Sequence, residues 1–133
     1  TRPWQHVLDP LYGYLLLGSN LLQNKLCVDL PSWNFGPDIN DLYDVNYIAK
    51  SFINKWDSKI KIKSINKNKN ESHLLQLNSE KAKLELGWKP TLILDETIDY
   101  TYQWYYDYFI KGESSITITN RQIDSFTNKN ENR

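Results

Sequence analysis

The stretch TRPWQHVLDPLYGYLLL, residues 1–17, places a cation, two rings and an imidazole directly before a long apolar run. Pro3 fixes its own φ and holds the preceding residue extended, which predicts a strand-like arm over residues 1–7. Asp9-Pro10 is an N-cap residue followed by proline at the first helical position. The sequence therefore predicts a helix that starts there and turns three residues inward: Leu11, Leu15 and Leu22.

The arm has two interpretations. Alternate side chains of an extended chain share a face, so Arg2, Trp4 and His6 should lie together. In the first interpretation this face is a buried strand end, and the arginine reaches water along its aliphatic stem. In the second it is an anion site, because a guanidinium binds phosphate oxygens through two parallel hydrogen bonds. The residues alone leave both open.

Composition limits the classes of function. The chain has 133 residues, enough for one domain, and 16 Lys and Arg against 16 Asp and Glu. This balance gives no overall bias towards nucleic acid or membrane, and the lysine-rich segment Lys55–Lys69 is expected to be a solvated face. The single Cys27 excludes an internal disulfide and favours a reducing compartment. With no secretory signal and no apolar run of about 18 residues, we expect a cytoplasmic globular protein.

The rest of the chain predicts a mixed α and β pattern. Short strands are expected at residues 32–37, 60–63 and 75–77. The most regular helical stripe lies within residues 45–56 and should be core; it consists of Val45, Ile48, Ala49, Phe52, Ile53 and Trp56. Ser79 should cap a helix that runs through Leu86 and ends at Gly87 in a left-handed C-terminal cap.

The end of the chain predicts one more helix. Asp95 can start it, and Tyr102, Tyr105 and Phe109 recur at helical spacing. Such an aromatic stripe is more often core than a base-stacking platform, so we expect these rings to be buried. After Phe126 the sequence offers nothing to bury, which predicts a disordered tail over residues 127–133.

Searches for catalytic motifs find none. His6, His73 and Cys27 have no metal-ligand spacing, so we expect no metal site. The sequence contains no glycine-rich phosphate loop and no nucleophile elbow. No tyrosine is followed by lysine four residues later. We therefore assign no catalytic residue to this chain.

Four segments occur in an order and spacing that resemble a known family: RPWQHVLDPLYGYLLL, WNFGP, ESHLLQLNSEKAKLELGWKP and TIDYTYQWYYDYFIKGE. Together they resemble the C-terminal part of CDP-glucose 4,6-dehydratases, nucleotide-sugar enzymes of the extended short-chain dehydrogenase/reductase superfamily. The L-G-W-x-P ending at Pro90 is typical of many sugar-nucleotide epimerases and dehydratases. The R-P-W-Q-H-V-L motif is narrower and indicates the CDP-glucose branch.

The resemblance implies a fold and an activity. Residues 1–126 should form a small C-terminal substrate-binding lobe of mixed α/β (α+β) class, mostly helical with a few short strands, that closes over CDP-D-glucose. A Rossmann domain absent from this chain would hold NAD and the catalytic Ser/Thr, Tyr and Lys. The intact enzyme, expected to be a homo-oligomer, would form CDP-4-keto-6-deoxy-D-glucose, whereas this chain alone should be inactive. A fragment of another nucleotide-sugar epimerase or reductase, or a non-catalytic interaction domain, stays open.

The resemblance also implies substrate-binding residues. Arg2 would lie near the diphosphate, and Trp4 and Gln5 would shape the pocket, although simple packing of Trp4 is an equal alternative. Asn34 would lie at a strand end close to the substrate. Glu71 would accept ribose hydroxyls, unless it is a solvated loop carboxylate. His6 is expected to be a structural hydrogen-bonding residue.

Overall fold

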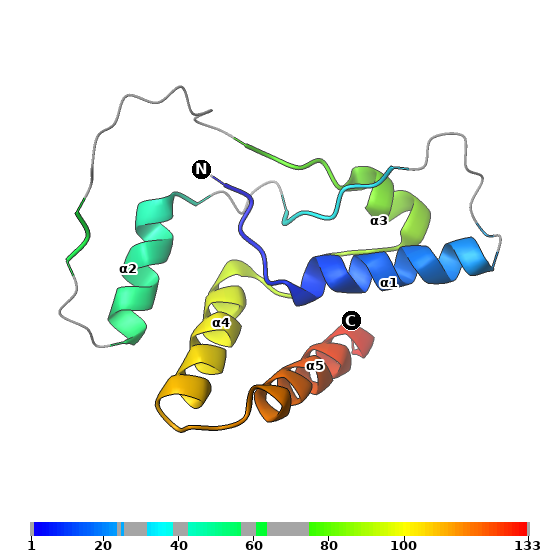
Figure 1. Ribbon diagram of the computed structural model, residues 1–133. Helices are drawn as coiled ribbons and strands as arrows, with labels where there is room; N and C mark the ends of the chain where they lie inside the picture. The colour runs from blue at the N-terminus through cyan, green and yellow to red at the C-terminus, as the bar shows by residue number, and fades with distance from the viewer. Residues whose placement is uncertain are drawn as a thin grey trace.

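The computed structural model describes residues 2–23, 25, 32–38, 43–56, 61–63 and 75–132. In this part the chain forms five α-helices (Figure 1): α1 Leu8–Leu22, α2 Val45–Lys55, α3 Glu80–Leu86, α4 Leu94–Phe109 and α5 Ser115–Glu131. α1 packs on α3, α2 on α4, and α4 on α5. The expected dominance of helices is confirmed.

The predicted short strands are not confirmed. Within the described residues the only β-type pairing is an isolated antiparallel bridge between Arg2 and Tyr43. Residues 32–38, 61–63 and 75–79 have no regular secondary structure, and residue 60 lies outside the described residues. Segment 32–38 is held instead by side chains, because Gln5 Nε2 donates to Phe35 O at 2.9 Å and Ser79 Oγ to Gly36 O at 3.2 Å.

Helix α1 differs from expectation in its start and its orientation. It begins at Leu8, so Asp9 lies in the first turn and is completely buried instead of capping the helix. Turning Asp9 inward turns other positions outward, because residues of a helix share a face only three or four apart. The three leucines expected inside are therefore exposed: Leu11 by 45%, Leu15 by 76% and Leu22 by 87%.

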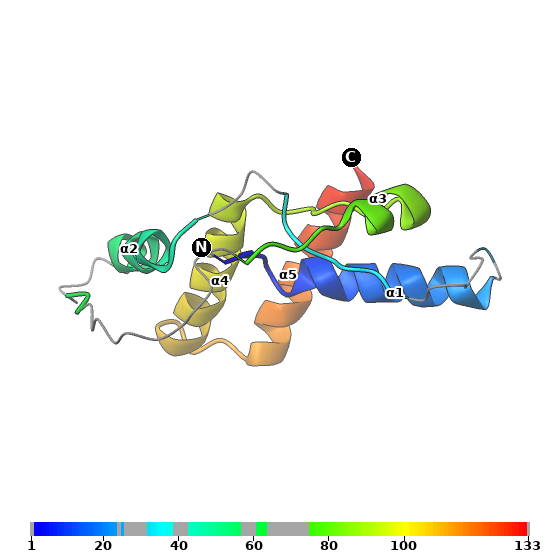
Figure 2. The same ribbon diagram turned by 90° about the horizontal axis from the view of Figure 1, so that it is seen from above.

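The first core cluster joins α1 and α3. Phe35, Leu86 and Trp88 are buried together, and the half-buried side chains that pack on them from α1 are Tyr12, Leu16 and Leu17. The Phe35 and Trp88 rings meet edge to face, with centroids 5.2 Å apart. These residues come from three separate segments, so the cluster holds segment 32–38 between the two helices. Figure 2 shows this segment running beside both.

The second core cluster joins α2 and α4. Ile48 of α2 is buried against Leu94 and Ile98 of α4, and the half-buried Trp4, Tyr43 and Phe52 pack on them. The helical stripe predicted as core is thus only partly buried, since Val45 at the start of α2 is 60% exposed. The carboxylate of Asp44 accepts from the backbone N–H of Tyr47 and caps this helix.

The expected boundaries of α3 are close to those observed. Gly87 has a φ of 66° and ends the helix in the left-handed conformation, as predicted. Ser79 occupies the N-cap position, but its hydroxyl donates to Gly36 O and makes no cap bond. The side chain of Asn78 instead accepts from the Glu80 backbone N–H at 2.9 Å.

The aromatic residues of α4 were predicted to be core, and two of them are not. The helix begins at Leu94, one residue before the expected Asp95. Tyr105 is 47% exposed and Phe109 66% exposed, whereas Tyr102 is half-buried against Trp56. Within the described residues α4 packs on α2, α5 and the N-terminal arm, and its remaining face carries rings on the surface.

A further helix replaces the tail expected after Phe126. α5 continues to Glu131, so the prediction of disorder over residues 127–131 is wrong. Polar contacts hold this end of the helix: Lys129 forms an ion pair with Glu96, and Thr91 Oγ1 donates to Asn130 Oδ1 at 3.0 Å. Apolar patterning gives no signal for these polar partners, which lie 33 and 39 residues away along the chain.

Candidate functional site

The N-terminal arm is fixed by hydrogen bonds to two distant segments. Trp4 Nε1 donates to Tyr43 O at 3.1 Å, and Gln5 Nε2 donates to Phe35 O at 2.9 Å. The Trp4 backbone N–H donates to Arg2 O at 3.0 Å, a local turn that the predicted extended conformation does not contain. The arm is therefore held in place before α1 begins.

Trp4 and Gln5 face the interior. Both line a small cavity of about 200 Å³ together with apolar residues of α2 and α4. Trp4 packs on the second core cluster, as its packing interpretation expects, and its contact with substrate stays a prediction. Gln5 Oε1 is buried and makes no hydrogen bond within the described residues. Such an acceptor costs free energy unless another group supplies a donor.

His6 is a structural hydrogen-bonding residue, as expected. It is 8% exposed, and its ring meets the Tyr100 ring edge to face at a centroid distance of 5.4 Å. Burial lowers the pKa of His6 below its usual 6.5, so the ring is neutral near pH 7. Nδ1 accepts from the Leu8 backbone N–H at 3.3 Å, which places the single ring proton on Nε2.

The remaining predicted substrate-binding residues are only partly brought together. Asn34 is exposed, and its Nδ2 donates to Asn78 O at 3.3 Å. Because Gln5 binds the carbonyl of Phe35, Asn34 lies next to the arm. The backbone of Arg2 pairs with that of Tyr43 in the isolated antiparallel bridge. Glu71 lies outside the described residues.

A cleft of about 400 Å³ opens between the arm, α4 and α5. Its lining combines two rings of α4 with neutral polar side chains and the start of α1: Gln5, His6, Val7, Leu8, Thr101, Trp104, Tyr105, Thr119 and Gln122. None of these side chains carries a formal charge near pH 7. The volume lies within the range of about 300–1,000 Å³ that is typical of small-molecule sites.

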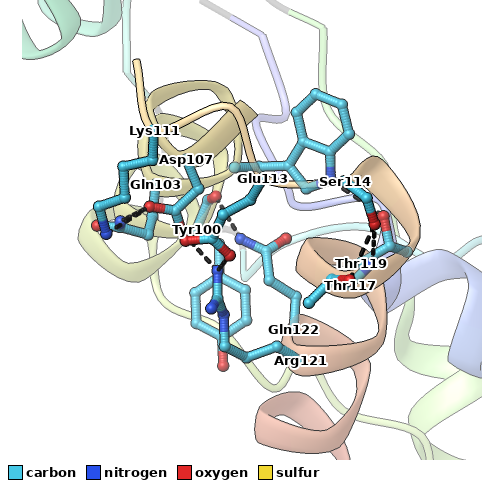
Figure 3. A network of polar contacts seen from close by, with 11 residues as sticks. Tyr100, Gln103, Asp107, Lys111, Glu113, Ser114, Thr117, Thr119, Arg121 and Gln122 are labelled. Atoms are coloured by element: carbon cyan, nitrogen blue, oxygen red, sulfur yellow. Dashed lines mark hydrogen bonds and ion pairs between the residues drawn. The ribbon is translucent and has the colours of Figure 1, made fainter. Parts of the chain in front are cut away.

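An ionic network closes the α4–α5 hairpin near this cleft (Figure 3). The carboxylate of Asp107, 3% exposed, accepts from Lys111 at 2.9 Å, Gln103 at 2.7 Å and Arg121 at 2.7 Å. Arg121 also binds Glu113 at 2.9 Å. The hydrogen bond from Lys111 is the main cause that lowers the pKa of Asp107, with smaller contributions from Gln103 and both cations, while burial opposes them.

Of the two buried carboxylates in the described part of the chain, Asp107 has no sequence prediction, whereas Asp9 is predicted in a different role. Gln103, Asp107 and Lys111 stand four residues apart, and this spacing could have identified the network along α4. No local signal indicates that Arg121 joins it. Asp9 was noticed, but as a helix cap; its Oδ1 instead accepts from the Thr91 backbone N–H at 2.6 Å, across 82 residues of sequence.

No glycine-rich turn between a strand and a helix, the dinucleotide-binding motif of Rossmann folds, occurs among the described residues. Here Gly13 lies inside α1 and Gly87 follows α3, while Gly112 lies between α4 and α5. No group of three potential metal ligands occurs among the described side chains. Within the same part of the chain, no helix combines the length and apolarity needed to cross a bilayer.

Comparison with known proteins supports the resemblance seen in the motifs. Over 126 residues the chain is 32% identical to CDP-glucose 4,6-dehydratase of Salmonella typhimurium, and the match covers 94% of the chain. The predicted resemblance is confirmed. The chain spans about a third of that relative, 34% of its length, in the C-terminal part. No protein-family model matches the chain.

Proposed function

We propose that this chain is the substrate-binding C-terminal part of a CDP-D-glucose 4,6-dehydratase, a lyase that forms CDP-4-keto-6-deoxy-D-glucose. The observation that carries the proposal is the match to the Salmonella dehydratase over 94% of the chain. NAD would be bound by an N-terminal Rossmann domain outside these residues, since the match covers only the C-terminal third of the Salmonella dehydratase. That domain and further copies of the protein are the proposed partners.

The proposed role of this chain is to bind and orient the nucleotide sugar. Arg2 supplies a guanidinium for the diphosphate, in the two-pronged geometry that suits phosphate oxygens. The hydrogen bonds of Trp4 and Gln5 to distant backbone carbonyls support this role, because a fixed arm loses little conformational entropy on binding. Asn34, next to the arm, and Glu71 complete the proposed set.

The activity test compares two proteins. The intact protein that carries these residues should convert CDP-glucose to the 4-keto product in the presence of NAD. The isolated 133-residue chain should show no turnover, because dehydration of a nucleotide sugar needs a bound hydride carrier and a positioned base. Turnover of another nucleotide sugar with CDP-glucose inert would contradict the proposed substrate.

The role of Arg2 is tested in the intact protein by substitution. Arg2→Ala should weaken CDP-glucose binding by roughly 1.5–3 kcal/mol, the range for a hydrogen bond to a charged group. Arg2→Lys should recover only part of this loss, since an ammonium keeps the charge without the planar fork. Affinity and melting temperature are measured on both variants. Normal affinity with lowered stability would show that Arg2 serves packing instead.

A further inference from the structure

The rings of α4 are arranged as a ladder on the surface. The indole of Trp104 stacks on Tyr108 with centroids 5.3 Å apart, and Tyr105 lies parallel to Phe109 at 6.1 Å. The edge of Tyr105 meets the Trp104 ring at 5.3 Å. Of these rings, Trp104 and Tyr105 also line the cleft between the arm, α4 and α5, whereas Tyr108 and Phe109 lie outside it.

The polar groups of the cleft restrict its occupant. The Gln122 side chain is oriented by its donation from Nε2 to Tyr100 O at 2.6 Å, and its Oε1 has no partner among the described residues. The hydroxyl of Tyr105 has none there either. His6, whose Nδ1 already accepts from the backbone, offers its Nε2 proton. The lining thus presents acceptors and a donor beside aromatic faces.

The absence of charge from this lining argues against ionic ligands. A phosphate or carboxylate would find no cation among the residues that line the cleft, so its desolvation would not be offset. A purely hydrocarbon ligand would cover the amide oxygen and the imidazole N–H without bonding them. A nucleobase avoids both penalties, because it carries no charge and its edge has donors and acceptors for these polar groups. Its flat face can also stack on the aromatic rings.

We propose that the cleft lined by Trp104 and Tyr105 binds the base of a pyrimidine nucleoside, with Tyr105 as the stacking residue. This assignment rests on the proposed function, in which the substrate is a cytidine diphosphate sugar and Arg2, at the start of the same arm, receives its phosphates. Three peptide units separate Arg2 from Gln5, so the two lie at most about 11 Å apart along the arm. The neutral base and the charged phosphates then occupy separate ends of one arm.

The test measures binding of free cytidine to the intact protein by titration calorimetry. Tyr105→Ala should weaken this binding about 5- to 150-fold, the loss expected for one stacked base. Tyr105→Phe, which keeps the ring, should retain most of the affinity. Tyr47→Ala is the matched control, because Tyr47 is 42% exposed on α2 and does not line the cleft. It should leave the affinity for cytidine unchanged.

Several results would overturn the assignment. Absence of cytidine binding, equal losses from Tyr105→Ala and Tyr47→Ala, or binding of methyl glucoside in place of cytidine would each contradict a base site. If the protein turns over CDP-glucose but Tyr105→Ala does not change its affinity for cytidine, the base does not bind in this cleft, and the proposed function still holds. Cytidine binding that depends on Tyr105, in a protein without CDP-glucose turnover, would support the cleft and reject the proposed reaction.

Discussion

The carboxylate of Asp9 accepts a hydrogen bond of 2.6 Å from the backbone N–H of Thr91, 82 residues later in the chain. Both residues are completely buried. The backbone carbonyl of Asp9 also accepts from Trp88 Nε1 at 3.2 Å, so a single residue of α1 binds two positions of the segment between α3 and α4. These two hydrogen bonds fix the start of α1 against the segment that leads from α3 into α4.

Removing the Asp9 carboxylate should destabilise the protein. Asp9→Ala leaves the buried N–H of Thr91 without its acceptor and should lower the free energy of unfolding by about 1–3 kcal/mol. Asp9→Asn keeps an acceptor oxygen and should cost less. Urea denaturation provides the measurement. Asp95→Ala is the matched control, an exposed carboxylate in the first turn of α4 whose loss should cost at most about 1 kcal/mol. Equal effects at both positions would contradict the proposed importance of Asp9.

Two glycines of α1 should respond oppositely to alanine. A Cβ on Gly13 would overlap the buried Phe35 ring, so Gly13→Ala should destabilise the protein by about 1–3 kcal/mol. A Cβ on Gly18 would have nothing within 4 Å, so Gly18→Ala should raise stability by up to about 1 kcal/mol through its better helix propensity. Melting temperatures of the two variants test this pair. A tolerated Gly13→Ala would show that Phe35 does not rest on α1.

Asp107 should make stability depend on pH in acid. Its pKa is lowered in the folded protein below the usual 3.8, mainly by the hydrogen bond from Lys111. The stabilisation is therefore complete above about pH 4 and is lost as the pH falls through the folded-state pKa. Asp107→Asn should flatten this acid-side loss in thermal melts. In the control Glu113→Gln, which breaks only an exposed pair with Arg121, the slope should persist. If stability falls with pH as steeply in Asp107→Asn as in the original protein, this acid-side loss arises from other carboxylates.

The outward face of α1 should drive association of the isolated 133-residue chain. Leu11, Tyr14, Leu15 and Leu22 are 45–87% exposed along one helix, and large apolar patches of this kind mark contact surfaces. Sedimentation velocity should show oligomers that the double variant Leu15→Glu and Leu22→Glu reduces. Leu84→Glu, at a singly exposed leucine of α3, should change the distribution little. A chain that stays monomeric at high concentration would refute the expectation.

Much of the local structure could be predicted because it depends on neighbouring residues. Gly87 ends α3 in the left-handed conformation, as glycine allows at low cost. Helices also occur where apolar periodicity predicts them, over residues 45–55 and from residue 94. The start of α1 differs from expectation by two residues and the start of α4 by one. The resemblance to the dehydratase likewise rested on motifs within the sequence, and the comparison confirmed it.

The candidate site was harder to predict because its contacts join distant segments. The exposure of Tyr105 depends on how α4 packs against α2 and α5, which helical spacing does not specify. The partners of Gln5 and Trp4 lie 30 and 39 residues away. The expected strand at residues 32–37 has no ladder in the described structure, because side chains occupy the carbonyls of Phe35 and Gly36.

The sequence by itself determined four of the five described helices, α1 to α4, and which family the chain resembles, since both depend on side chains close together along the chain. Only the tertiary structure decided which face each helix buries. Asp9 turned inward to bind Thr91, so the leucines of α1 turned outward. Lys129 reached Glu96, so α5 continued beyond Phe126, the last apolar residue of the sequence. A helix has the same local hydrogen bonds whichever face it buries, and long-range contacts alone distinguish the alternatives.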